Sequence, residues 1–220
     1  SEVILMRKKH ELFFAAGLVL AILISNTVGF VRDGLALDRL RGSVLRLHIL
    51  AESDSERDQT LKLRVRDALL ESGILDGADS LAEAEDIAAD RLPDIERIAE
   101  TVLRANGCEL PVEAELADTE FDVRTYGDIT MPAGTYRALR VKIGSAKGHN
   151  WWCVMYPSLC VPAACEVTDD KQEELRRFDD KELDILYEPQ KYEVRFAIWD
   201  KIMEIGKTVV VHCDENCGDA

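Results

Sequence analysis

The chain has 220 residues, which allows one domain of ordinary size with appendages. A hydrophobic content of 47% supports a packed core and excludes a wholly disordered protein. The formal net charge of −15 argues against nucleic-acid binding, because phosphate recognition requires a basic surface.

The first 32 residues have the pattern of a secretory signal or an uncleaved membrane anchor. The basic stretch Arg7-Lys8-Lys9 precedes an apolar run from Leu12 to Ile24, and Ser25-Asn26-Thr27 then breaks the run. A buried core helix is the weaker interpretation, because basic flank and apolar run occur together. The flanking charge predicts that the rest of the chain lies outside the cytoplasm. No small-x-small cleavage site follows, so cleavage and anchoring both stay open.

Residues 44–51 predict a strand that is buried on one face only. The apolar side chains alternate with two polar ones: Leu45, Leu47 and Ile49 on one face, Arg46 and His48 on the other. The polar face is expected to be solvated.

A helix is predicted from about Glu56 to Glu71, with its core stripe at Leu61, Val65, Ala68 and Leu69. Ser53 and Glu56 match a capping box. Asp58 and Lys62 are spaced as an i, i+4 ion pair.

A second capping box, Ser80 with Glu83, opens a further helix that Asn106-Gly107 ends. Pro93 must kink or split this helix, because its ring removes a backbone hydrogen bond.

Strand patterns follow the second helix. Residues 112–116, 121–125 and 136–143 alternate, and Met131-Pro132-Ala133-Gly134 predicts a turn. Residues 40–165 are therefore expected to form an α+β domain. It would hold a small antiparallel sheet of about four strands, with two to three helices packed on it and the hydrophobic export or anchor helix before it.

The composition changes after Cys165. Residues 166–190 are highly charged and are interpreted as a linker or an exposed helix. Residues 191–206 recover an apolar stripe and predict a C-terminal helix docked on the core, although Tyr192 to Ile198 also alternate as a strand would. Residues 207–220 are expected to be a loose tail.

Six cysteines together with an export signal suggest disulfides. Cys153 and Cys160 share one local segment and are the preferred pair. Cys213 and Cys217 are a second candidate pair, and Cys108 and Cys165 would then pair or stay free. Sequence alone does not determine this connectivity.

The candidate binding stretch is His149-Asn150-Trp151-Trp152. Residues 144–148 precede it as a flexible lead-in. Adjacent tryptophans beside His and Asn are too polar for a plain core strand and too aromatic for a plain loop. Exposed tryptophans are typical anchors of protein interfaces. In the alternative interpretation, one ring belongs to the core and the other lines the base of the loop.

Catalytic and metal interpretations are weaker. His149 and Cys153 would suit a base and a nucleophile, but exported cysteines are more often oxidised. His48 with a nearby Asp would suit an acid–base pair, but a solvated strand face and an ordinary helix N-terminus explain every residue and are the preferred interpretation. No CxxC pair occurs, so no metal site and no cofactor are predicted.

Two long motifs resemble the stage II sporulation protein R family, over about residues 40–162. The first runs from Leu45 to Ser55 and continues through Asp58-Gln59 and Leu61 to Ala68. The second comprises Tyr126-Gly127-Asp128, Met131 to Tyr136, Ala138 to Val141, Gly144, Gly148 to Val154, Pro157 and Cys160. The chain departs from the pattern at Glu52, where the family usually has Asn.

The resemblance implies a non-enzymatic signalling protein of endospore-forming bacteria. Such a protein is exported from the forespore into the space between the two membranes, secreted or anchored there. It activates a membrane-embedded aspartic protease that cleaves the precursor of sigma factor E. A ligand of this kind needs only to bind the active state of the protease better than the resting state.

The expected contact surface is the stretch from His149 to Cys160, with Arg46, His48, Ser53 and Asp54 supporting it or forming part of it. The rival hypothesis is an extracytoplasmic cell-wall or peptide hydrolase that uses His149 and Cys153. A third possibility is an anchored structural module whose tryptophans are buried.

Overall fold

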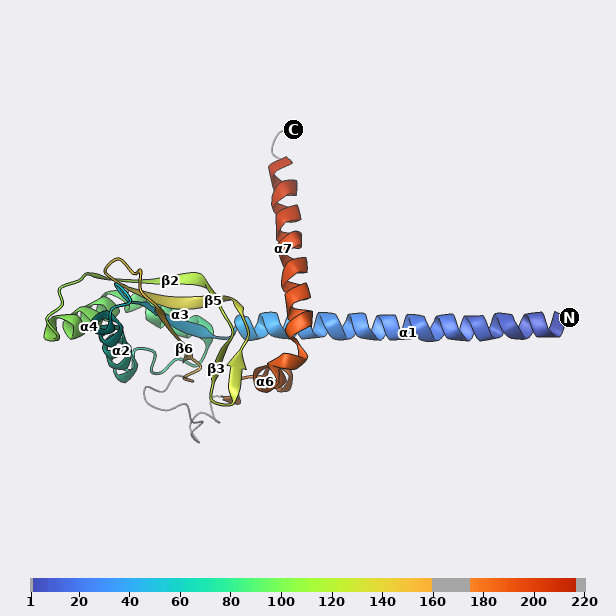
Figure 1. Ribbon diagram of the computed structural model, residues 1–220, viewed down its shortest axis with the longest axis horizontal. Helices are drawn as coiled ribbons and strands as arrows, with labels where there is room; N and C mark the ends of the chain where they lie inside the picture. Colours follow the sequence, from blue (N-terminus) through green and yellow to red (C-terminus); the bar gives the residue numbers. More distant parts are fainter. Residues whose placement is uncertain (1, 160–174, 217–220) are drawn as a thin grey trace. The chain divides into compact units, whose positions relative to one another are not determined.

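The computed structural model describes the backbone of residues 2–159 and 175–216, and the side chains of residues 13–14, 16–159 and 175–205. The chain divides into two compact units. One comprises residues 39–189, and the other joins residues 1–38 to residues 190–220. Figure 1 labels their helices and strands.

The larger unit is an α+β domain, so the expected fold class is confirmed. Its helices are α2 (Glu56–Glu71), α3 (Leu81–Asp90), α4 (Leu92–Ala105) and α6 (Asp180–Tyr187). Its main sheet contains β1 (Leu45–Leu50), β2 (Val112–Phe121), β5 (Gly134–Ile143) and β6 (Asn150–Tyr156). A separate hairpin pairs β3 (Arg124–Tyr126) with β4 (Ile129–Met131).

The strand order is β2-β5-β1-β6, and β1 runs parallel to β5. The expectation of a purely antiparallel sheet was therefore wrong for this pair, and the sheet is mixed. The physical reason is the connection: after β1 the chain passes through α2, α3 and α4, returns to the sheet as β2, forms the β3–β4 hairpin, and only then enters β5. This path places β1 in the centre of the sheet.

The principal core lies between the sheet and its helices. Leu47 and Ile49 of β1 pack with side chains of α2, α4 and β5, and both are 0% exposed. The core residues that α2 and α4 contribute include Leu61, Val65, Leu69, Ile95, Ala99 and Leu103. This apolar burial is the main stabilising contribution, at about 25 cal/mol per Å².

Local sequence signals explain the helix boundaries, with one correction. The N-cap of α2 is Ser55, which accepts a hydrogen bond from the Asp58 amide, and not Ser53. Ser53 instead donates its hydroxyl hydrogen to the Asp58 carboxylate. The second helix is split as Pro93 predicted, because the proline falls in the first turn of α4, where no helical N–H is lost.

The segment predicted as a charged linker includes α6. Asp179 and Glu182 form a reciprocal capping box at its start, and Ile185 and Leu186 are 0% exposed. Helix α6 contacts β4. Two large buried apolar side chains thus tie this segment to the domain despite its charged composition, and residues 166–174 lie outside the described part of the chain.

The smaller unit contains α1 (Glu2–Arg41) up to Asp38, the end of the 3-10 helix η1 (Pro189–Lys191) and α7 (Glu193–Asn216). The stretch Ala16–Arg41 of α1 is long and apolar enough to cross a membrane. Helix α7 contacts α1 through Trp199. Its backbone stays helical to Asn216, so the tail predicted to be loose from residue 207 is helical over most of its length.

Candidate functional site

The two adjacent tryptophans point to opposite faces of β6, as successive strand residues do. Trp151 faces the α2 side, where the Arg66 guanidinium lies 4.3 Å from its ring centroid. Trp152 faces the other side of the sheet, with its ring centroid 5.4 Å from that of Phe121. Both tryptophans are partly buried. Each ring therefore covers one face of the sheet, and neither stands free on a loop.

Beside this strand, two loops are joined into one structure that we call the loop junction, residues 51–54 and 144–149. The amide of Gly148 donates to the Ala51 carbonyl at 2.9 Å, and that of Lys147 donates to the Glu52 carbonyl at 3.3 Å. The Glu52 carboxylate accepts from the Ser145 amide. The lead-in that the sequence presents as flexible is thus tied to the end of β1.

Gly148 makes this close approach possible. A Cβ atom at this position would lie 2.3 Å from the Ser53 carbonyl oxygen and 2.5 Å from its carbon. Real Cβ atoms do not come this close to backbone, so any side chain at position 148 would push the two loops apart.

His149 and Asp54 form the exposed centre of the loop junction. The Asp54 carboxylate accepts from both the backbone amide and the ring Nδ1 of His149, each at 2.5 Å. The backbone hydrogen bond is the largest cause that lowers the pKa of Asp54, followed by the side-chain hydrogen bond. The side chains are 81% and 55% exposed, so the pair offers both charge and hydrogen-bonding groups to a partner.

Side chains of helix α2 hold the loop junction through hydrogen bonds. Lys62 donates to the His149 carbonyl at 2.9 Å and to the Gln59 amide oxygen, while Gln59 donates to the Ser53 carbonyl. Burial is the largest cause that lowers the pKa of Lys62, although Asp54 opposes it. The i, i+4 spacing predicts an ion pair of Lys62 with Asp58, whereas Lys62 instead donates to Gln59 and the His149 carbonyl. The spacing of Gln59, Lys62 and Arg66 on one helix face was the available signal for this role.

Arg46 and His48 do not belong to the exposed site, and the prediction of a solvated strand face was wrong. Arg46 is 0% and His48 5% exposed, because β1 is a central strand with both faces covered. The Arg46 guanidinium lies 4.0 Å from the Phe121 ring centroid and donates to the Tyr126 hydroxyl. We call this cluster the aromatic face; it comprises Arg46, His48, Phe121, Tyr126, Tyr136 and Trp152.

Burial lowers the pKa of His48 to about 4, with the Asn150 side chain opposing the shift and Arg140 and Arg46 adding to it. His48 is therefore neutral at pH 7. Its ring packs at 5.7 Å from Phe121 and 6.0 Å from Trp152, measured between centroids. His48 therefore has the environment of a core aromatic residue, and among the described side chains the polar groups that shift its pKa are Asn150, Arg140 and Arg46.

The structure also separates His149 from Cys153. Four residues of extended chain place them roughly 13 Å apart. Cys153 is disulfide-bonded and 1% exposed, which removes the thiolate that a nucleophile needs. Its expected partner, Cys160, lies outside the described residues, as do Cys165, Cys217 and the side chain of Cys213. Cys108 is a buried free thiol.

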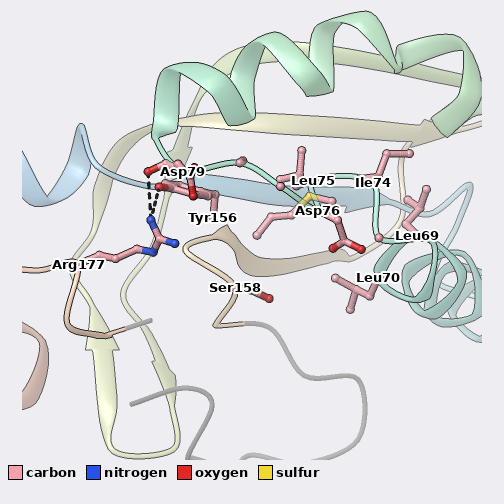
Figure 2. A pocket seen from close by; sticks show the side chains of 13 residues that line it. Leu69, Leu70, Ile74, Leu75, Asp76, Asp79, Tyr156, Ser158 and Arg177 are labelled. Carbon is pink, nitrogen blue, oxygen red and sulfur yellow. Dashed lines mark hydrogen bonds between the residues drawn. The ribbon is translucent and has the colours of Figure 1, made fainter. Parts of the chain in front are cut away.

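A cavity of about 310 Å³ lies elsewhere, between the α2–α3 loop and the end of β6. Figure 2 shows Arg177 reaching Tyr156 and Asp79 at its rim, where its guanidinium donates to the Tyr156 hydroxyl and the Asp79 carbonyl at 3.1 Å each. None of the candidate binding residues lines it. Among the side chains that the structure describes, no group of three or more His, Cys, Asp or Glu is arranged to hold a metal ion.

Comparisons with known proteins point to one family. The family model described as stage II sporulation protein R matches residues 41–166. The curated stage II sporulation protein R of Bacillus subtilis (strain 168) is 36% identical over 119 residues, which cover 53% of each chain. The alignment thus spans about half the length of this relative. No solved structure matches the chain.

Proposed function

Because this chain belongs to the stage II sporulation protein R family and has a role in sporulation, we propose that it is an exported signal that activates a protease in trans. The protease would be the membrane-embedded aspartic protease that processes the sigma factor E precursor. The chain would act from the space between the two membranes, held there by α1. It would do so as a ligand and not as an enzyme.

The observation that carries this proposal is the loop junction. His149 and Asp54 are exposed, yet their loops are held in place: Gly148 and Lys147 donate to the Ala51 and Glu52 carbonyls, and Lys62 donates to the His149 carbonyl. A surface ordered before binding loses little conformational entropy when a partner docks. Such a surface suits a ligand that must select one state of its receptor, and the selection requires differential contact alone.

The roles of the candidate residues divide accordingly. His149, Asn150 and Asp54 are exposed and would contact the protease, while Ser53 shapes the loop through its bond to Asp58. Trp151 and Trp152 would contact the partner at the edge strand β6, one from each face of the sheet, through their partly exposed rings. Arg46 and His48 would support the surface from within the aromatic face and not touch the partner.

The test is reconstitution of the protease with its precursor substrate in vesicles, with the full-length chain supplied on the outer side. We expect His149→Ala and Asp54→Ala each to lower precursor cleavage at least tenfold at equal chain concentration. Asp94→Ala is the matched control, because Asp94 is also an exposed carboxylate in an ion pair, with Arg97 on α4. Folding is checked by circular dichroism for each variant.

Full activation by folded His149→Ala and Asp54→Ala chains would exclude the loop junction as the contact surface. The hydrolase alternative makes a different prediction. In that case, the chain would cleave cell-wall or peptide substrates without the protease, and the rate would fall on replacement of His149 or Cys153.

A further inference from the structure

Helix α7 presents an apolar stripe that the smaller unit leaves uncovered. At 100° per residue, the side chains of α7 fall into three arcs. One arc contains Arg195 and Trp199, which contact α1, and the buried Phe196. A second, about 80° wide, contains Val194, Ile198, Ile202 and Ile205, which are 74%, 50%, 50% and 55% exposed. The third is polar, with Glu193, Asp200, Lys201 and Glu204.

Specific contacts fix α7 on α1 within this unit. The Trp199 ring meets Phe30 edge-on at a centroid distance of 5.8 Å, and its Nε1 donates to the Asp38 carboxylate at 3.0 Å. Arg195 forms an ion pair with Asp33. Gly34 lets the indole lie on the α1 backbone, because a Cβ atom there would come within 2.1 Å of the Trp199 ring. The exposed arc therefore has a defined place beside α1.

Helix α7 contacts α1 where the apolar surface of α1 ends. Apart from Phe30, the described large apolar side chains of α1 over residues 13–31 are 40–81% exposed and include Phe13, Phe14, Leu18, Leu20, Leu23, Ile24, Val28 and Val31. The contacts with α7 begin at Phe30 and end at Asp38, where Arg32 and Asp33 bring the first charges after this run. If α1 spans a bilayer, Trp199 sits at the interface, the depth that tryptophan prefers.

We propose that the stripe Val194, Ile198, Ile202 and Ile205 inserts into the interface between headgroups and acyl chains of the bilayer that α1 spans, so that α7 lies on the outer membrane surface. The inference rests on the proposed anchoring by α1. In Figure 1, α7 crosses α1 instead of running beside it, as a helix in the membrane plane must do. Interfacial helices bury one apolar face about 5–10 Å deep.

Tethering explains why the stripe needs no basic residues of its own. A free interfacial helix often depends on Lys and Arg to reach anionic lipids. A helix linked to a membrane span instead experiences a high effective concentration of lipid, so modest apolar burial suffices. The mixed charges of the polar arc, Glu193, Asp200, Lys201 and Glu204, agree with attachment through the apolar arc alone.

The experiment places the photo-crosslinker p-benzoyl-L-phenylalanine in the full-length chain, in place of Ile198 or Ile202. The chain is reconstituted in vesicles of phosphatidylethanolamine and phosphatidylglycerol, irradiated and analysed by mass spectrometry. Lys201 is the matched control, since it is an exposed neighbour on the polar arc. Leu20, exposed on α1, reports separately on the membrane span.

We expect lipid adducts at positions 20, 198 and 202, and at least fivefold fewer at position 201. Adducts at position 20 with none at 198 and 202, or with equal yields at 201, would overturn the α7 proposal and leave the anchor standing. Adducts between two chains at 198 and 202 would also overturn it, because a second copy would then cover the stripe. Adducts at 198 and 202 but not at 20 would support the stripe and overturn the anchor, and no adducts at all would overturn both.

Discussion

His48 and His149 are both prominent in the sequence, yet they occupy opposite kinds of environment. His48 is 5% exposed within the aromatic face, and burial holds its pKa at about 4. The His149 side chain is 81% exposed and bonds the Asp54 carboxylate in the loop junction. Polar residues of the two family motifs thus build two different regions, an inner one that maintains the sheet and an outer one available to a partner.

The largest expected effect tests the aromatic face. Arg46→Ala removes the side chain between Phe121, Tyr136 and the Tyr126 hydroxyl and leaves a cavity. We expect the free energy of unfolding to fall by about 3 kcal/mol, in the range of large-to-small core substitutions. Chemical denaturation of the full chain in detergent measures it.

Arg46→Met separates packing from charge, since methionine refills most of the volume without the guanidinium. Replacing a buried charge by an apolar side chain of similar size is often neutral or stabilising. If Arg46→Met lowers the free energy of unfolding as much as Arg46→Ala does, the guanidinium cation itself stabilises this region through its aromatic and hydroxyl contacts.

The next largest expected effect is the pH dependence of folding stability that His48 causes. Its pKa in the folded chain, about 4, lies below the ordinary 6.5, so the unfolded chain binds more protons between these values. The stability is fully present above pH 6.5 and is lost as pH falls toward 4. We expect a loss of about 2 kcal/mol between pH 7 and pH 5. Denaturation of the wild-type chain and of His48→Gln measures it, because glutamine does not titrate.

The contribution of His48 is the difference between the wild-type chain and His48→Gln in the loss of unfolding free energy from pH 7 to pH 5. Asp54 contributes little in the same interval, because its pKa lies below the ordinary carboxylate range. An equal slope of stability against pH in both proteins would mean that His48 is solvated and that the aromatic face opens readily.

Of the three regions tested, the loop junction is expected to show the smallest loss of stability. Gly148→Ala places a Cβ atom against the Ser53 carbonyl and forces the loops apart at the edge of the domain. We expect a loss of about 1.5 kcal/mol together with loss of protease activation. Denaturation and the reconstituted cleavage assay measure the two quantities.

Gly107→Ala is the control for this substitution. Gly107 has φ +68 and open space at its Cβ position, so alanine there meets conformational strain without a clash. A cost of about 1 kcal/mol is expected, with activation retained. If Gly148→Ala activates the protease as well as Gly107→Ala does, the geometry of the junction does not matter for signalling.

Local patterns were sufficient for much of the fold. Strand alternation at Leu45, Leu47 and Ile49 identified a core face, and the bounds of α2 agree with its apolar stripe and first-turn acids. Pro93 divided α3 from α4 as expected, because its ring acts on the adjacent backbone alone. Each of these features depends on interactions within a few residues, which a sequence pattern records.

The exposure of the polar residues, by contrast, depends on long-range strand pairing. Strand alternation predicted that Arg46 and His48 form a solvated face. They are buried because the parallel pairing with β5 makes β1 a central strand. Asp54 and His149 lie 95 positions apart and meet because β1 and β6 are neighbours. Local sequence patterns thus identified most of the helices and strands, the family motifs and the residues worth testing. Their division between core and surface depended on strand order, which arises from long-range pairing that no local periodicity encodes.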